Sequence, residues 1–102
     1  MKYISSTHNP LIKKLNLLMS KARVRKKENL FVVSGNRELS RALEMGYNID
    51  TMFYREGCDE EIIFENSAKV FELSDALFDR VIMRSSSEEV IAILEAKSCL
   101  LY

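Results

Sequence analysis

The chain has 102 residues, 47% of them hydrophobic and 29% charged, and its net charge is zero. These values indicate one globular domain and argue against a disordered chain. No apolar run approaches the roughly 20 residues of a membrane helix, and the N-terminus lacks the apolar stretch of a secretory signal. Cys58 and Cys99 fit no metal or redox spacing. We therefore expect a cytoplasmic protein with two reduced thiols.

The zero net charge conceals a strong asymmetry along the chain. The first 27 residues carry eight Lys and Arg and no Asp or Glu, whereas the other 75 carry seven Lys and Arg against 15 Asp and Glu. A concentrated positive segment attracts polyanions, although charge alone does not say which. Its basic residues are Lys2, Lys13, Lys14, Lys21, Arg23, Arg25, Lys26 and Lys27.

The first predicted element is an amphipathic helix over residues 9–22. Asn9 suits the N-cap and Pro10 the first helical position. At 100° per residue, one apolar stripe faces a core and the lysines lie opposite, with Leu17 as an apolar exception among them. The stripe comprises Leu11, Ile12, Leu15, Leu18, Met19 and Ala22. Residues 23–29 either extend this helix or form a basic connector.

Helices and strands alternate through the rest of the chain. Leu30–Val33 is predicted as a strand covered on both faces and ended by Ser34-Gly35. The later elements are a helix over 36–45 capped by Asn36 with Gly46 after it, a strand over 49–54, an acidic helix over 58–66, a strand over 70–73, a helix over 75–82 capped by Ser74 with Ala76, Leu77, Val81 and Phe78 inward, a loop over 85–87 and a strand over 90–94.

This alternation predicts the fold class and the domain organisation. We expect an α/β protein, a three-layer α/β/α sandwich around a mostly parallel four-stranded sheet. We expect a single domain over residues 1–102, in which 1–27 form a basic helical segment and 28–102 the α/β body.

Motifs for catalysis are missing from the sequence. It contains no glycine-rich phosphate loop and no Cys/His cluster for zinc. The single histidine, His8, has no aspartate within 40 residues. Adjacent carboxylates such as Glu88-Glu89 are typical of a solvated surface. We therefore expect no catalytic residue, no metal site and no cofactor site in this chain.

The basic segment has several interpretations. It can be a solvated helix face, a docking surface for an acidic protein surface, a membrane-surface helix or a site for nucleic-acid phosphates. The apolar stripe lacks Trp and Phe and is needed for the core, which disfavours the membrane. No acidic residue neutralises the segment, which favours RNA. Arg23 and Arg25 are candidates for bidentate phosphate contacts.

A second candidate site is the turn around Gly35. The glycine lies between a predicted strand and a predicted helix, where backbone can approach a ligand closely. Arg37 then falls in the first helical turn, where the helix dipole disfavours a cation, so an external anion is one interpretation. An exposed Arg paired with Glu38 is the other.

Taken in order, these residues resemble one family. Ile4, Ser6, Asn9, Ile12, Lys13 and Leu15 match its opening pattern I-x-S-x-x-N-x-x-I-K-x-L, and the basic stretch and the Phe31–Arg37 segment follow. The family is the N-terminal substrate-binding domain of the SpoU (TrmH-like) RNA ribose methyltransferases. This chain departs from the pattern at Ser34, where the family has Glu, and at Ser87-Glu88-Glu89, where a Pro-Gln-Gly turn is common.

The resemblance implies a fold similar to kink-turn-binding ribosomal proteins and a role in recognising ribosomal or transfer RNA. It implies a parent enzyme that methylates ribose 2′-hydroxyls with S-adenosylmethionine, in a separate C-terminal SPOUT domain that dimerises and is absent from this chain. We expect this chain alone to be neither catalytic nor cofactor-binding. A free-standing structural RNA-binding protein is the alternative. The RNA-binding candidates are Asn9, Lys13, Lys14, Lys21, Arg23, Arg25, Lys26, Lys27 and Arg37, with Gly35 as a structural turn.

Overall fold

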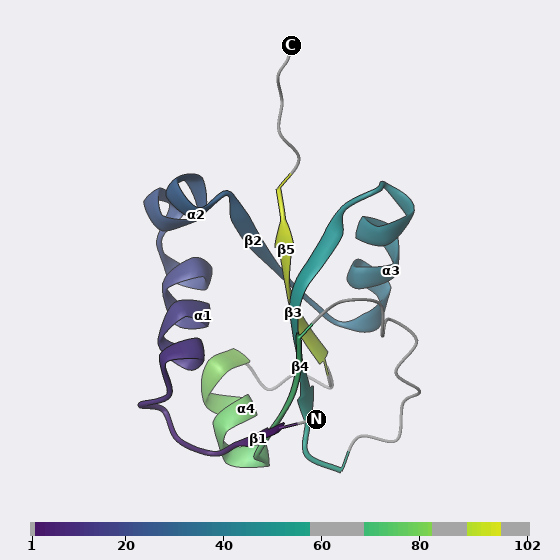
Figure 1. Ribbon diagram of the computed structural model, residues 1–102. Helices are drawn as coiled ribbons and strands as arrows, with labels where there is room; N and C mark the ends of the chain where they lie inside the picture. The colour runs from purple at the N-terminus through teal and green to yellow at the C-terminus, as the bar shows by residue number, and fades with distance from the viewer. Residues whose placement is uncertain (1, 58–68, 83–89, 97–102) are drawn as a thin grey trace.

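The structure, a computed structural model, describes residues 2–57, 69–82 and 90–96, which form a five-stranded sheet with four helices (Figure 1). The elements are β1 (Lys2–Ile4), α1 (Pro10–Ser20), α2 (Ala22–Glu28), β2 (Leu30–Ser34), α3 (Asn36–Glu44), β3 (Asn48–Arg55), β4 (Lys69–Leu73), α4 (Asp75–Ile82) and β5 (Val90–Glu95). The predicted α/β class is confirmed. The helix predicted over 58–66 and the loop predicted over 85–87 lie outside the described residues.

The sheet is mixed, with strand order β1-β4-β3-β5-β2. β4 pairs in parallel with β1 and β3, whereas β5 runs antiparallel to both β3 and β2. The expectation of a mostly parallel four-stranded sheet was therefore wrong in two respects, the number of strands and the direction of β5. An apolar run predicts a strand but not its direction, which depends on the path of the preceding connection.

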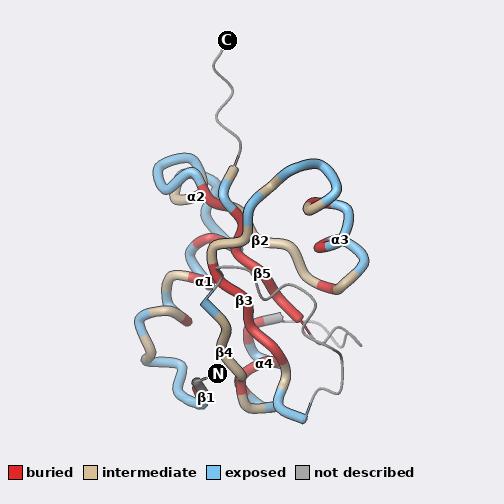
Figure 2. Tube along the Cα trace, turned by 45° about the vertical axis from the view of Figure 1, so that its right-hand side comes forward, coloured by how far each residue is buried: buried red, intermediate tan, exposed pale blue. Residues whose placement is uncertain are grey.

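Helices cover both faces of the sheet. α1, α2 and α4 pack on one face and α3 on the other, so β5 lies between two apolar cores (Figures 1 and 2). Ile91 and Ile93 of β5 contribute to the first core, and Val90, Ala92 and Leu94 to the second. Two covered faces account for the continuous apolar run in this strand.

The helix ends follow local rules in most places. Asn9 caps α1 through its side-chain oxygen, and Ser74 Oγ accepts a hydrogen bond from the third residue of α4 at 3.2 Å, as predicted. Gly46 follows the last turn of α3 with φ 90°, and the Gly46 and Tyr47 N–H groups bond to the carbonyls of Leu43 and Ala42. This is the Schellman arrangement, in which glycine tolerates the left-handed conformation.

The sequence analysis missed one element and was wrong in several details. β1 was missed, because three residues carry too little pattern and this strand exists through its pairing with β4. β2 has the predicted cover on both faces, but it is an edge strand and therefore mostly half-buried rather than buried. Asn36 is not the cap of α3, since Gly35 occupies that position. Ala76 is exposed rather than inward, and Met19 and Ala22, which were predicted on the core-facing stripe, are exposed as well.

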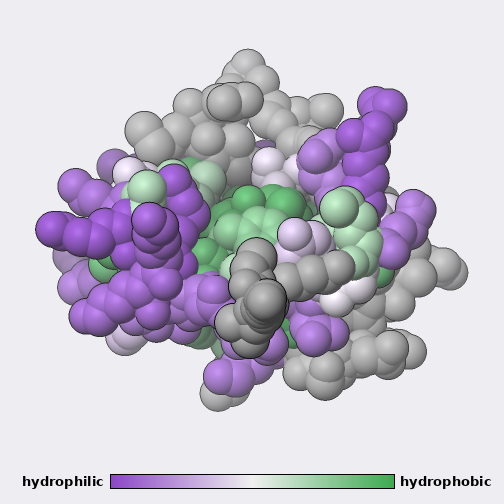
Figure 3. All heavy atoms as spheres, turned by 90° about the horizontal axis from the view of Figure 1, so that it is seen from above, coloured by the Kyte–Doolittle hydropathy of each residue, from purple (hydrophilic) through white to green (hydrophobic). Residues whose placement is uncertain are grey.

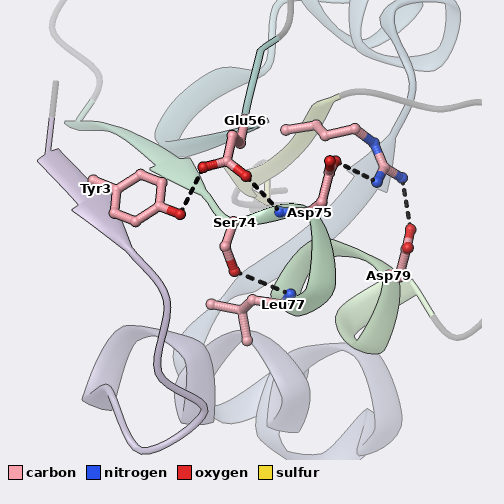
Figure 4. A network of polar contacts seen from close by, with 7 residues as sticks. Tyr3, Glu56, Ser74, Asp75, Leu77 and Asp79 are labelled. Atoms are coloured by element: carbon pink, nitrogen blue, oxygen red, sulfur yellow. Dashed lines mark hydrogen bonds and ion pairs between the residues drawn. The ribbon is translucent and has the colours of Figure 1, made fainter.

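A polar network joins β1, α4 and the end of β3 (Figure 4). Glu56 accepts a hydrogen bond from the Tyr3 hydroxyl at 2.7 Å and one from the Asp75 N–H at 3.4 Å. The Glu56 contact is the main cause that raises the pKa of Tyr3, because a carboxylate acceptor favours the neutral phenol. Arg55 pairs with Asp75 at 3.1 Å and with Asp79 at 2.9 Å. The network fixes the short edge strand and the start of α4 to the sheet.

Candidate nucleic-acid interface

Helix α1 presents its lysines because its other side is held by the core. Ile12, Leu15 and Leu18 are fully buried against the sheet. The Asn9 cap and Pro10 start the helix at a defined residue, with Asn9 Oδ1 accepting from the Leu11 N–H at 2.9 Å. The opposite side therefore projects outward, leaving Lys13 exposed and Lys14 half-buried. Asn9 is thus the helix cap that the sequence predicts, and its contact with RNA stays a prediction.

Helix α2 continues the basic surface after a sharp break. Lys21 adopts an extended conformation, with φ −121° and ψ 107°, and separates the two helices. Val24 is the half-buried anchor of α2 on the first core. Asn29 ends α2 in the left-handed conformation with φ 60°. Most of residues 23–29 therefore lie in a second short helix, and its outward cations are Arg23, Lys26 and Lys27.

Arg25 differs from its basic neighbours. Its side chain is half-buried, and Nη1 donates a hydrogen bond of 2.7 Å to the Leu18 carbonyl near the end of α1. A cation at this position bonds one of the carbonyls that a helix end leaves without a helical partner, and it complements the helix dipole. The sequence predicted Arg25 as a phosphate ligand. In the structure it fixes the corner between the two helices, a role that sequence spacing does not reveal.

The exposed cations of α1 and α2 have no carboxylate partner among the described residues. The ion pairs that the described residues form lie elsewhere: they join Arg41 to Glu38 and Arg55 to two aspartates. In this N-terminal portion Glu28 is the first acidic residue. We define the basic face as Lys13, Lys14, Lys21, Arg23, Lys26 and Lys27. Figure 3 shows hydrophilic side chains gathered on the side of the molecule that carries α2.

Arg37 lies apart from the basic face. It is exposed in the first turn of α3, which covers the other face of the sheet (Figure 1). Glu38 pairs with Arg41 at 3.8 Å rather than with Arg37. The structure therefore does not bring Arg37 together with the other predicted RNA-binding residues.

Gly35 forms the predicted turn between β2 and α3. It is buried, its φ is 92° and its ψ is 146°, and its N–H bonds to the Val90 carbonyl at 2.9 Å. This conformation is essentially restricted to glycine. The turn thus fixes how the chain leaves the edge strand and enters α3.

Sequence reasoning missed a groove that opens beside this turn. It has a volume of about 280 Å³ and lies where β2 meets α1 and α2. No motif marks its lining, which comes from three separate elements.

Among the described residues, no cluster of three His, Cys, Asp or Glu side chains could hold a metal. No helix in the described ranges is long and apolar enough to cross a membrane.

Comparison with known proteins identifies the domain. The family model described as the MRM3-like substrate binding domain matches residues 9–92. The chain belongs to this family. The match contains α1, α2 and the Gly35 turn, so the resemblance drawn from the sequence is confirmed. No curated protein matches the chain.

Solved structures of RNA methyltransferases share the fold of this substrate-binding domain. An RNA 2′-O ribose methyltransferase superposes with a TM-score of 0.83 at 26% identity, covering 98% of this chain and 40% of that one. An rRNA methyltransferase from Sinorhizobium meliloti gives 0.76 at 22%, covering 96% and 38%. The SpoU methyltransferase AviRb from Streptomyces viridochromogenes, in complex with AdoMet, gives 0.70 at 20%, covering 88% and 34%. This chain therefore spans well under half the length of these proteins.

Proposed function

We propose that this substrate-binding domain recognises RNA for an S-adenosylmethionine-dependent 2′-O-ribose methyltransferase, and that the basic face contacts RNA phosphates. The observation that carries the proposal is the set of six cations on α1, α2 and the residue between them, none paired with a carboxylate in the described part of the chain. Family membership and the methyltransferases among the structural neighbours support this interpretation over that of a free-standing structural RNA-binding protein.

The domain's own contribution is positioning. Phosphate contacts fix the orientation of a nucleic acid on a protein without reading its sequence. Cations on two packed helices offer such contacts from a fixed surface, because the buried side chains of α1 and Val24 of α2 hold both helices on the sheet. RNA held in this way would present its target ribose to a catalytic domain elsewhere in the parent protein.

The chemistry belongs to that second domain in this proposal. S-adenosylmethionine would supply the methyl group there, and dimerisation and a cytoplasmic location are attributed to the parent enzyme. No carboxylate lines the groove between β2, α1 and α2 to pair with the amino group or the ribose hydroxyls of this cofactor. This domain would therefore select and orient the RNA, while a proton or methyl transfer would take place outside it.

A charge-matched comparison tests the proposal. In the test variant, Lys13, Arg23 and Lys27 become Gln, which removes three exposed cations of the basic face. We expect its affinity for a short RNA hairpin, measured by filter binding at low salt, to fall at least about tenfold, because each lost phosphate contact also forfeits counterion release.

The control removes the same charge elsewhere. In it, Arg41, Lys69 and Arg80 become Gln; all three are exposed and outside the basic face. We expect a much smaller loss, from the change in overall field alone. Equal losses in the two variants would mean that RNA responds to net charge and not to this surface, and the proposal would fail.

A further inference from the structure

The groove beside β2 has a mixed lining. Most of its side chains are apolar, one is a guanidinium and one a hydroxyl, and together they come from α1, α2 and the edge strand. The lining residues are Leu18, Met19, Arg25, Phe31, Val32 and Ser34. Its volume of about 280 Å³ is just below the range of about 300–1,000 Å³ typical of small-molecule sites. It can therefore hold a single ring system but not a helix of a partner protein.

The chemistry of the lining suits a flat ring with a polar edge. Met19 and Val32 offer apolar contact to a ring face, and methionine adapts its shape to a ligand. Arg25 donates one hydrogen bond through Nη1 to the Leu18 carbonyl, and its planar guanidinium carries further N–H donors. Ser34 can donate or accept. A nucleobase combines the required apolar face with hydrogen-bond acceptors on its edge.

The position of the groove beside the basic face indicates which class of ligand carries such a ring. The groove shares α2 and the end of α1 with the basic face, and none of its lining residues is acidic. In an RNA strand whose phosphates contact Arg23 and Lys26, each of these phosphates is joined through the adjacent ribose to a base. Unpaired bases splayed from single-stranded regions are the usual targets of specific RNA recognition.

We propose that this groove takes one unpaired nucleobase of the RNA whose phosphates bind the basic face. The proposal rests on the proposed function and adds a base-reading contact to it. It also gives Arg25 a second role, because the residue that fixes the corner between α1 and α2 directs its remaining donors to the base edge.

The test separates base binding from phosphate binding. Affinities of the full chain are measured for a single-stranded oligoribonucleotide and for an abasic oligomer with the same number of phosphates. Stacking and burial of one base are worth about a fivefold to a hundredfold gain in affinity. We expect the base-bearing oligomer to bind tighter by a factor in this range.

Two variants with the same charge change then locate the base. Met19→Glu places a carboxylate in the groove, whereas Leu17→Glu places one on the outward side of α1. Neither residue belongs to the core, because Met19 is 37% exposed and Leu17 45%. We expect Leu17→Glu to weaken both oligomers alike and to preserve their affinity ratio. We expect Met19→Glu to reduce that ratio at least about fivefold. Thermal melts check that both variants are folded.

Each result supports or overturns the base assignment. Equal affinities of the wild type for the two oligomers would overturn it. A ratio that survives Met19→Glu would place the base elsewhere and also overturn it. Binding of neither oligomer would overturn the proposed function itself, and with it this inference.

Discussion

The contacts of Arg55 allow a stability prediction with a matched control. The Arg55 side chain is 18% exposed, and its guanidinium lies 4.5 Å from the centroid of the Phe78 ring. It also pairs with Asp75 and Asp79 at 3.1 and 2.9 Å. Burial works against the charged form, but the hydrogen bonds to the two aspartates outweigh it and raise the pKa of Arg55. Arg55→Met removes the charge and keeps an unbranched apolar side chain over the ring.

The expected loss follows from these contacts. Each pair to an exposed carboxylate contributes about 0.2–1 kcal/mol, since Asp75 and Asp79 are 64% and 65% exposed. The cation–π contact adds about 0.5–2 kcal/mol at a partly desolvated site. We expect Arg55→Met to lower the free energy of unfolding by about 1–4 kcal/mol. For a domain of this size the melting temperature would fall by about 4–30 °C.

Thermal unfolding followed by circular dichroism measures the effect. The matched control is Arg41→Met, because Arg41 pairs with Glu38 at 3.8 Å and both side chains are well exposed. Such a pair contributes less than about 0.5 kcal/mol, so we expect a shift of only a few degrees. Equal, small shifts in both variants would refute the assignment of Arg55 as a stabilising centre.

Three further outcomes are expected. Arg25→Gln removes a charge-assisted hydrogen bond at the end of α1 and should lower the free energy of unfolding, measured with a chemical denaturant, by about 1–2 kcal/mol. The control Lys26→Gln, at an exposed residue, should lower it by less than about 0.5 kcal/mol. Similar losses in the two variants would contradict the structural role of Arg25. Gly35→Ala should cost about 1–3 kcal/mol in the same assay, because φ is 92° there; an unchanged midpoint would contradict the turn geometry. The raised pKa of Tyr3 predicts that its hydrogen bond to Glu56 stabilises the fold below pH 10 and that this contribution is lost as the phenol ionises above pH 10. The melting temperature of a Tyr3→Phe chain should therefore differ from that of the wild type below pH 10 and converge with it above. A difference that stays constant with pH would argue against this linkage.

The parts of the fold that the sequence predicted are those set by local rules. Asn9-Pro10 and the apolar stripe define α1, and Gly46 ends α3 through its left-handed conformation. Elements set by tertiary pairing were not predictable. β1 depends on β4 for its existence, and the antiparallel direction of β5 depends on the path of the chain before it.

The candidate site shows the same division. Charge and helical period predicted that the lysines of α1 lie on its outward side, because the buried Ile12, Leu15 and Leu18 determine which side faces the core. They did not predict that the Arg25 guanidinium folds back onto a carbonyl seven residues earlier. Arg37 follows a family motif in the sequence, but the sheet separates it from the basic face. A groove built from three elements leaves no pattern in any one of them.

The salt dependence of RNA binding tests the central claim most directly. The logarithm of the association constant falls linearly with the logarithm of salt concentration, with a slope of about 0.7–0.9 per phosphate neutralised. Replacing Lys13, Arg23 and Lys27 with Gln should therefore reduce the magnitude of the slope by about 2. A slope unchanged from wild type would contradict the account, because it would mean that these cations do not contact RNA phosphates.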